Sequence, residues 1–347
     1  RKGTDTYKYA HVQKVCGRED VLPMWVADMD FKTPPFVMRA IENRLKQQVL
    51  GYTCPPESYY ESIVNWCRSH FNWDITTSDI NYVPGVVCGI YLAMQAFTEK
   101  GDKILIQEPV YHPFRIVPEG SERVIVWNHL VRTETSFAMD LEALRRDIKG
   151  CKMMILCNPH NPAGKCWDIK TLREVAHICH EEGVVVVSDE IHCDMALWGN
   201  KHLPFAMASE KAAQCSITFG APSKTFNIAG IVSSYAIVPN DTLRQKFYSW
   251  LTANEFNEPT LFAPIATIAA FQQGEAWRKA MLHYVEQNIL FVEDYCRQHM
   301  PQIKPLRPQA SFLVWLNCRQ LGLTHDQLVD LFVNHAHLAL NDGEMFG

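Results

Sequence analysis

Three polar side chains of this sequence lie where a predicted strand ends and a loop begins. Asn161 belongs to the turn that follows the apolar run Met153–Cys157, and Asp189 follows a nearly all-valine run. Lys224 comes a few residues after the run Ile217–Phe219. Open α/β sheets bind their ligands at the carboxyl ends of their strands. We therefore expect an amide, a carboxylate and an amine to meet at one ligand site.

Each of these side chains has a chemical interpretation and a simpler one. Partial burial among small and apolar neighbours would lower the pKa of Lys224 and make it a nucleophile, but a loop lysine can also be a surface charge. A carboxylate at Asp189 needs a cationic partner, which a ligand or an ordinary ion pair could supply. Asn161 could direct its amide at a ligand or only shape its turn. Their shared placement favours a common role.

An anion site is predicted near the same edge of the sheet. The sequence from Tyr82 runs through Gly85 into a helix, so the amides of Val86 and Val87 could receive a phosphate, although Gly85 could simply end a strand. Pyridoxal 5'-phosphate (PLP) needs a lysine for its aldehyde, an acid for its pyridinium, a donor for its phenolate and an anion site. The residues together therefore predict a PLP-dependent enzyme that acts on amino acids.

The elements that position these residues follow from hydrophobic patterning. Between about residues 80 and 240, short apolar runs alternate with helical stretches, which is typical of an α/β fold around a mostly parallel sheet. Seven strands are expected at Ile80–Val83, Lys103–Gln107, Val124–Trp127, Met153–Cys157, Val184–Ser188, Ile217–Phe219 and Ser233–Val238. Helices are expected at Val86–Phe97, Leu141–Ile148 and Asp168–Glu182, the last with Asp168 as N-cap and Gly183 as its stop.

The flanks of this region predict a second, smaller part. The N-terminal flank should hold a helix that Thr33 caps and that runs through Leu45, and Glu275–Met300 should form one long helix that crosses a domain boundary. Beyond it we expect strands at Ile303–Leu306 and Phe312–Leu316 and a helix at Asp326–His335. The predicted division is an N-terminal segment, 1–45, that belongs with the small domain, a large domain, 46–285, and an apparently incomplete small α+β domain, 286–347.

Composition excludes several classes of protein. The formal net charge of -5 has the wrong sign for binding nucleic acid or an anionic membrane. No apolar stretch is long enough to be a secretion signal or a membrane span, so we expect a cytoplasmic location. The 12 cysteines include no C-x-x-C pair and should be free, and no ligand spacing predicts a metal. His192-Cys193-Asp194 alone is too short to indicate one.

Five motifs carry a resemblance to a known family. They are Leu22–Phe31, Glu108–Phe114, Asn158–Gly164, Ser188–His192 and Ser223–Asn227. Through them the whole chain resembles the fold type I PLP enzymes of the class I and II aminotransferase superfamily, and within it the cystathionine β-lyase (cysteine C–S lyase) branch. The resemblance implies the PLP-dependent transferase-like fold, with a seven-stranded, mostly parallel sheet in a large domain and a small α+β domain.

The resemblance also implies roles for individual residues. Lys224 would hold PLP as a Schiff base, Asp189 would pair with the pyridinium nitrogen, Asn161 and His192 would lie near the ring oxygen, and Tyr111 would stack on the ring. Aminotransferases usually carry tyrosine where this chain has His192. We therefore expect α,β-elimination at a C–S bond, with an aminotransferase as the alternative and a non-catalytic PLP-binding regulator as a second one.

Further implied roles depend on a neighbouring subunit and on the N-terminal segment. Tyr52 would reach the phosphate of the partner subunit, which implies a homodimer with its active sites at the interface, although a core tyrosine is the alternative. Trp25 and Asp28 would fold over the substrate, with packing as the alternative for Trp25. Many relatives have a phosphate-binding serine where this chain has Ala221, which leaves Ser223 as a replacement.

One expected residue does not occur. The arginine that grips the substrate carboxylate in this family belongs to a C-terminal Met-Arg-Leu-Asn type motif, and no arginine of this sequence is a convincing substitute. We therefore expect the natural chain to continue beyond Gly347.

Overall fold

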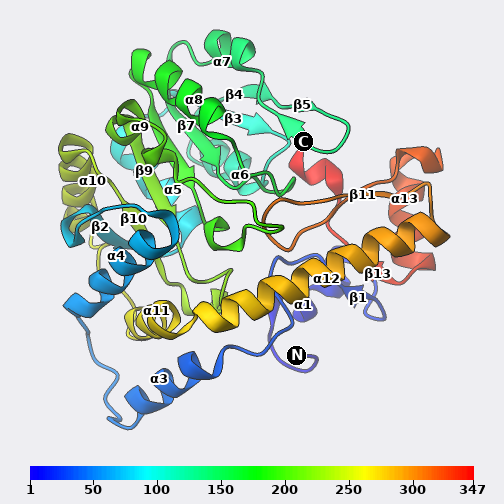
Figure 1. The fold of residues 1–347 in the computed structure, drawn as a ribbon, viewed down its shortest axis with the longest axis horizontal. Coiled ribbons are helices and arrows are strands. Elements are labelled where there is room, and N and C mark those ends of the chain that lie inside the picture. The colour runs from blue at the N-terminus through cyan, green and yellow to red at the C-terminus, as the bar shows by residue number, and fades with distance from the viewer.

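A seven-stranded sheet forms the centre of the protein, and a computed structural model describes all 347 residues (Figure 1). The strand order is β2-β10-β9-β8-β7-β3-β4. Neighbours are parallel except that β10 is antiparallel to both β2 and β9. The bounds are β2 Ile80–Val83, β3 Lys103–Glu108, β4 Val124–His129, β7 Cys151–Cys157, β8 Val185–Asp189, β9 Ser216–Gly220 and β10 Ser234–Ile237. Each of the seven predicted strands is present, so the predicted α/β class is confirmed.

Helices cover both faces of this sheet, which explains the continuous apolar runs of its central strands. One face packs against Ile90, Phe114 and Phe247, which come from α5 (Val86–Phe97), α6 (Pro113–Gly120) and α10 (Asp241–Ala253). The other face packs against α7 (Leu141–Asp147), α8 (Ile169–Glu181) and α9 (Glu210–Cys215). Because both faces are covered, a ligand can reach these strands only at the edge of the sheet where β7, β8 and β9 end.

Local sequence accounts for the start and the end of α8. The Asp168 side chain accepts hydrogen bonds from the backbone amides of Lys170 and Thr171 at 2.9 and 3.0 Å. Gly183 has a φ of +66°, a left-handed conformation that costs glycine little. Both the predicted N-cap and the predicted stop are confirmed.

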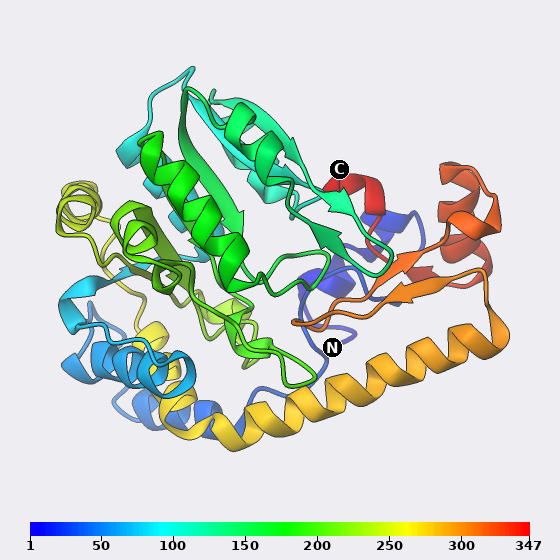
Figure 2. The same cartoon turned by 45° about the horizontal axis from the view of Figure 1, so that its top comes forward.

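The remaining elements lie around one end and the underside of the sheet (Figures 1 and 2). The helices are α1 Tyr7–Ala10, α2 Val12–Cys16, α3 Pro35–Leu45, α4 Glu57–Phe71, α11 Phe262–Gln273, α12 Glu275–His299 and α13 His325–Asp330. The short strands are β1 Leu22–Pro23, β5 Val131–Arg132, β6 Phe137–Ala138, β11 Lys304–Leu306, β12 Trp315–Asn317 and β13 Leu338–Ala339. The long helix α12 was predicted correctly and runs beneath the sheet toward β11 and α13.

Two predicted boundaries were wrong, and a third predicted element has its predicted end but a different form in its second half. Pro34, not Thr33, is the N-cap of α3, because a residue before proline is driven out of the helical region. The second small strand begins at Trp315 instead of Phe312, since Ser311 is tied to Met195 by a backbone hydrogen bond of 2.9 Å. The last predicted helix is split, with α13 followed by a π-helical turn over Leu331–His335.

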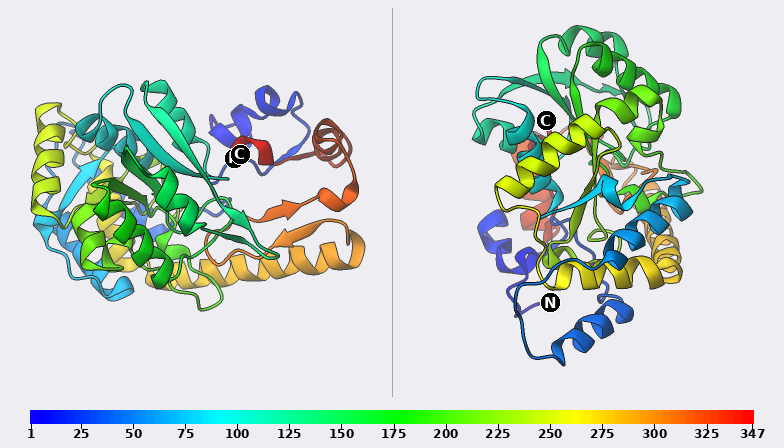
Figure 3. Two further views of the ribbon diagram at one scale, coloured as in Figure 1. Left: turned by 90° about the horizontal axis from the view of Figure 1, so that it is seen from above. Right: turned by 90° about the vertical axis from the view of Figure 1, so that its left-hand side faces the viewer.

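The N-terminal segment joins the C-terminal region. Strand β1 pairs in parallel with β13, with Leu22 opposite Leu338, and both panels of Figure 3 show the N-terminal helices, in blue, beside the C-terminal segment, in red. Helix α3, in contrast, packs against α11. The division into 1–45, 46–285 and 286–347 remains our proposal.

Candidate active site at the carboxyl edge of the sheet

Lys224 lies in the turn that follows β9. Its Nζ donates a hydrogen bond to the carbonyl oxygen of Ala27 at 2.7 Å. Burial lowers the pKa of Lys224, although the nearby carboxylates of Asp28 and Asp189 act in the opposite direction. Lys224 is therefore a half-buried amine near two carboxylates and not a fully solvated surface charge.

Asp189 is the last residue of β8 and is buried. The backbone amide of Ile191 donates to its Oδ1 at 3.0 Å. Burial raises the pKa of Asp189 to about 7, while that hydrogen bond and the charge of Lys224 lower it. A further cation beside this carboxylate would lower its raised pKa and favour the ionised form, which is the property that we expect of a partner for a ring nitrogen.

His192 and Asn161 are both buried, and each has a polar atom without a partner. His192 Nδ1 and Asn161 Oδ1 are buried and form no hydrogen bond within the protein. Burial, with the charge of Lys224, lowers the pKa of His192 to about 3, so the imidazole is neutral. Buried polar atoms without partners are uncommon in native proteins and indicate a place for a ligand.

Tyr111 lies beside the same residues. Its backbone amide donates to the carbonyl oxygen of Asn161 at 3.1 Å. Burial raises the pKa of Tyr111 to about 12, and the charge of Asp189 contributes in the same direction. Tyr111 therefore lies beside Asn161, and its stacking on a ligand ring remains a prediction.

The predicted anion site is the N-terminus of α5. Gly85, the N-cap, has a φ of +99°, and Val86 and Val87 are the first residues of the helix. The first backbone amide that donates a hydrogen bond within the helix is that of Gly89, which donates to the carbonyl oxygen of Gly85 at 2.8 Å. The amides of Val86 and Val87 are thus available to an anion. Ser223 is buried in the turn directly before Lys224, and its hydroxyl, unlike that of Thr225, is not bound to Asp194.

The N-terminal segment forms one wall of the site. Trp25 donates from Nε1 to the carbonyl oxygen of Lys8 at 3.1 Å and packs on Tyr7. Burial raises the pKa of Asp28, but hydrogen bonds from Arg1 and Lys8 outweigh it and leave the pKa lowered. Asp28 is therefore an ionised carboxylate near Lys224, whereas Trp25 makes the packing contacts that were the alternative to substrate binding.

Tyr52 is completely exposed, and the interpretation as a core tyrosine is therefore wrong. It lies between α3 and α4 in a segment without regular structure, beside Val49 and Leu50, which are 69% and 64% exposed. Large apolar side chains that are exposed together commonly mark an interaction surface.

Two supporting residues were not anticipated in their roles. Asp194 is buried, and its carboxylate accepts hydrogen bonds from Trp66 Nε1 at 2.8 Å and from Thr225 Oγ1 at 3.2 Å. Asn227 binds the backbone of the N-terminal segment. No local pattern pointed to either contact, because both partners are distant in sequence.

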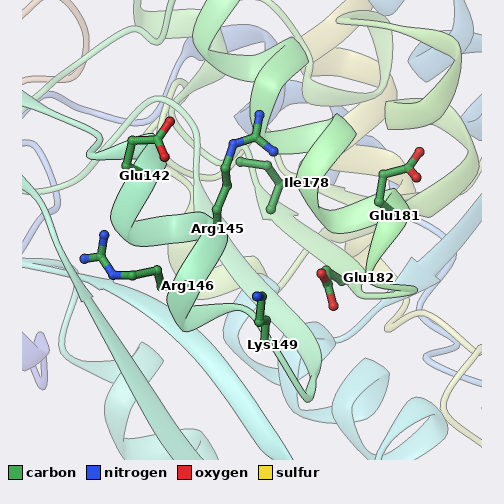
Figure 4. Close-up of a pocket in the computed structure, with 7 residues that line it drawn as sticks. All are labelled: Glu142, Arg145, Arg146, Lys149, Ile178, Glu181 and Glu182. Atoms are coloured by element: carbon green, nitrogen blue, oxygen red, sulfur yellow. The ribbon is translucent and has the colours of Figure 1, made fainter.

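A separate surface hollow of about 370 Å³ lies between α7 and α8 (Figure 4). It is lined by Glu142, Arg145, Arg146, Lys149, Ile178, Glu181 and Glu182. Its basic side chains come from α7 and the residues after it, two of its acidic side chains come from the end of α8, and Arg145 pairs with Glu174. None of the predicted site residues lines this hollow, so it is distinct from the candidate active site.

Comparison with known proteins agrees with this arrangement. Residues 19–347 match the model of the family described as aminotransferase class I and II. Cystathionine beta-lyase PatB of Bacillus subtilis is 38% identical over 349 residues, which cover 100% of this chain and 90% of the relative. Protein MalY of Escherichia coli is 30% identical over 352 residues, which cover 100% of this chain and 89% of the relative.

Solved structures give the same result. Cystalysin from Treponema denticola, whose structure contains PLP, has a TM-score of 0.96 at 30% identity, over 100% of this chain and 89% of that one. The resemblance inferred from the five motifs is confirmed, and this chain belongs to the class I and II aminotransferase family.

Proposed function

We propose that this protein is a PLP-dependent C–S lyase that carries out α,β-elimination on cystathionine or cysteine S-conjugates, with a thiol, pyruvate and ammonia as products. The observation that carries the proposal is that Lys224, in the turn after β9, and the buried Asp189, at the end of β8, lie near each other at the carboxyl edge of the sheet. Relatives named as cystathionine β-lyases support the type of reaction.

The residues present suit PLP. Asn161 and His192 have buried polar atoms without partners, Asp189 lacks a full counter-charge, and the first amides of α5 are free for a phosphate. Lys224 would hold the aldehyde carbon and Asp189 the ring nitrogen. Asn161 and His192 would lie at the ring oxygen, Tyr111 on the ring face, and Val86, Val87 and Ser223 at the phosphate. When bound, the cofactor supplies an electron sink for the carbanion that forms at the substrate α-carbon.

The side chains themselves bind, orient and move protons. Asp189 would stabilise a positive charge on the ring nitrogen, and its burial would strengthen that attraction because the local dielectric is low. Lys224 acts as the base that removes the substrate α-proton, and its lowered pKa increases the fraction of neutral amine. His192 stays neutral and can donate a hydrogen bond without adding a charge. Asp28 lies near the amine, and Trp25 belongs to the same N-terminal segment, where it packs on Tyr7.

The test separates elimination from amino-group transfer. PLP-loaded protein is incubated with L-cystathionine or an S-alkyl cysteine while pyruvate and free thiol are measured, and in parallel with an amino acid and 2-oxoglutarate while glutamate is measured. We expect pyruvate and thiol in equal amounts. Steady formation of glutamate without pyruvate would show an aminotransferase instead. The Lys224→Ala variant should have neither activity and should lose the visible absorbance band that the parent protein shows with PLP.

We further propose a homodimer in which Tyr52 of one subunit completes the phosphate site of the other. The complete exposure of Tyr52 and of the apolar side chains before it supports this proposal. A cytoplasmic location is also proposed, because all 12 cysteines are free, which is typical of a reducing compartment. No helix is both long enough and apolar enough to span a membrane.

A further inference from the structure

The side chain of Asn227 holds the backbone of the segment Ala27–Phe31 by three hydrogen bonds. Its Oδ1 accepts from the amide of Met29 at 3.1 Å. Its Nδ2 donates to the carbonyl oxygens of Met29 at 2.9 Å and of Phe31 at 2.7 Å. Both ends of one side-chain amide are thus used on a single segment, and we call this set of bonds the Asn227 clamp.

The same segment contacts the amine of Lys224. The Ala27 carbonyl oxygen accepts the hydrogen bond from Lys224 Nζ at 2.7 Å. One turn of the protein, which carries both Lys224 and Asn227, therefore binds one segment at two points. The position of the Ala27 carbonyl relative to Met29 is set by a short stretch of backbone, so the clamp also determines where that carbonyl lies.

The turn is itself fixed. The amide of Ile228 donates to the carbonyl oxygen of Ser223 at 3.0 Å, which closes the turn around Lys224. The hydroxyl of Thr225 donates to the buried carboxylate of Asp194 at 3.2 Å. Because the clamp and Lys224 share this rigid turn, the clamp positions the segment with respect to the amine and not with respect to a distant element.

A second anchor holds the segment from its other side. Lys8 is buried, and its Nζ donates to the carbonyl oxygen of Asp28 at 2.8 Å and pairs with the Asp28 carboxylate at 2.9 Å. Loss of the clamp therefore should not detach the segment from the protein. We expect it to move or loosen the segment within the site, which is a change that kinetics can detect.

The backbone at Asn227 provides a way to separate the clamp from the fold. Asn227 has a φ of +54°, which asparagine and glycine tolerate better than other residues. Asn72, the exposed C-cap of α4, also has a φ of +54° but lies outside the candidate active site. Asn227→Gly removes the clamp and retains the backbone conformation, and Asn72→Gly is its matched control.

We propose that Asn227 is a positioning residue: through the Ala27 carbonyl it determines where the Lys224 amine lies when that amine removes the substrate α-proton. This inference rests on the proposed function and names Asn227 as a residue that affects the rate of that reaction. A base that is misplaced slows proton transfer without changing the contacts that bind the substrate. The effect of removing the clamp should therefore be on kcat and not on KM.

The test compares PLP-loaded parent, Asn227→Gly and Asn72→Gly proteins by hydrogen–deuterium exchange and by steady-state kinetics with L-cystathionine. In Asn227→Gly we expect faster exchange in the peptide that contains Met29, because its amide loses its acceptor. We expect kcat to fall about tenfold or more while KM changes less than about threefold, as for a displaced base. Asn72→Gly should match the parent in exchange at Met29 and in kcat.

A second variant covers the possibility that the glycine protein folds poorly. Asn227→Asp keeps the acceptor for Met29 but replaces both donor contacts with repulsion between oxygens, and it should lower kcat by a similar factor. Faster exchange with an unchanged kcat would overturn the inference, as would unchanged exchange in both variants. If the parent itself releases no pyruvate, the proposed function has failed, and the exchange data still report whether the clamp exists.

Discussion

Thr225, the residue directly after Lys224, donates a hydrogen bond from its hydroxyl to the buried carboxylate of Asp194 at 3.2 Å. The other carboxylate oxygen of Asp194 accepts from Trp66. A buried acid from the loop after β8 thereby holds the turn after β9, and the elements that carry Asp189 and Lys224 are tied together at their exits. The relative position of Asp189 and Lys224 thus depends on a hydrogen bond in which neither of them takes part.

Replacement of Thr225 by valine should weaken the site through this contact. Valine has the shape of threonine but leaves Asp194 Oδ2 without its donor, which costs about 1–3 kcal/mol for a buried group. We expect a lower unfolding temperature together with a reduced kcat, measured by thermal denaturation and the pyruvate assay. Thr225→Ser keeps the hydroxyl and should retain most of the activity. Equal losses in the serine and valine variants would contradict this role.

The ionisation of Asp189 should make stability depend on pH in protein without PLP. The pKa of this group is about 7 in the fold against an ordinary value of 3.8, so its stabilising contribution is complete below about pH 4 and is lost as the pH rises to 7. The loss amounts to about 4 kcal/mol, since each pKa unit corresponds to about 1.4 kcal/mol. Without PLP, Asp189→Asn should therefore unfold at a higher temperature than the parent at pH 8 and differ little near pH 4.

Addition of PLP should reverse this order. With the cofactor bound, the parent gains an ion pair that the asparagine variant cannot form, so the parent becomes the more stable protein at pH 8. Thermal melts with and without PLP measure both halves of the prediction. The control is Asp74→Asn, because the Asp74 side chain is 85% exposed. A variant that is less stable than the parent at pH 8 even without PLP would show that burial does not dominate at Asp189.

The buried pair of Glu190 and His202 should contribute to stability. His202 Nε2 lies 2.7 Å from Glu190 Oε2, and Glu190 Oε1 accepts from Ser188 Oγ and from the amide of Phe205, both at 2.8 Å. His202→Ala would leave one carboxylate oxygen buried without a partner. We expect a loss of about 3 kcal/mol, which is typical of removing one member of a buried pair.

Urea denaturation of the His202→Ala protein measures this loss. The exposed His283 provides a control, and His283→Ala should unfold at the same urea concentration as the parent. A His202→Ala protein that unfolds together with this control would show that the pair adds nothing.

Hybrid dimers would test the role of Tyr52. Tyr52→Ala and Lys224→Ala proteins are each expected to be nearly inactive, since every site in either homodimer lacks one group. After they are mixed under conditions that exchange subunits, about a quarter of all sites should contain both groups, as random pairing of two-fold symmetric subunits requires. Recovery of pyruvate release to about that fraction supports a shared site. No recovery, with exchange demonstrated by mass spectrometry, would place Tyr52 outside the partner's site.

The main features of the fold could be predicted because they depend on local sequence. The central strands are continuous apolar runs, and the polar residues Asp189 and Lys224 stand out where those runs end. Boundaries that depend on distant contacts could not be predicted, such as the start of β12, which is delayed by the bond between Ser311 and Met195. The role of Asn227 was missed for the same reason, because its partners are backbone atoms far away in the sequence.

The pairing of β1 with β13 determines the order in which the protein can be assembled on the ribosome. Leu22 is synthesised long before its partner Leu338, which follows every strand of the central sheet in the sequence. The sheet that carries Asp189 and Lys224 can therefore form while β1 is still unpaired, and the wall that contains Ala27 closes after the sheet. We expect nascent chains to have a cofactor site that is open on this side until β13 has been made.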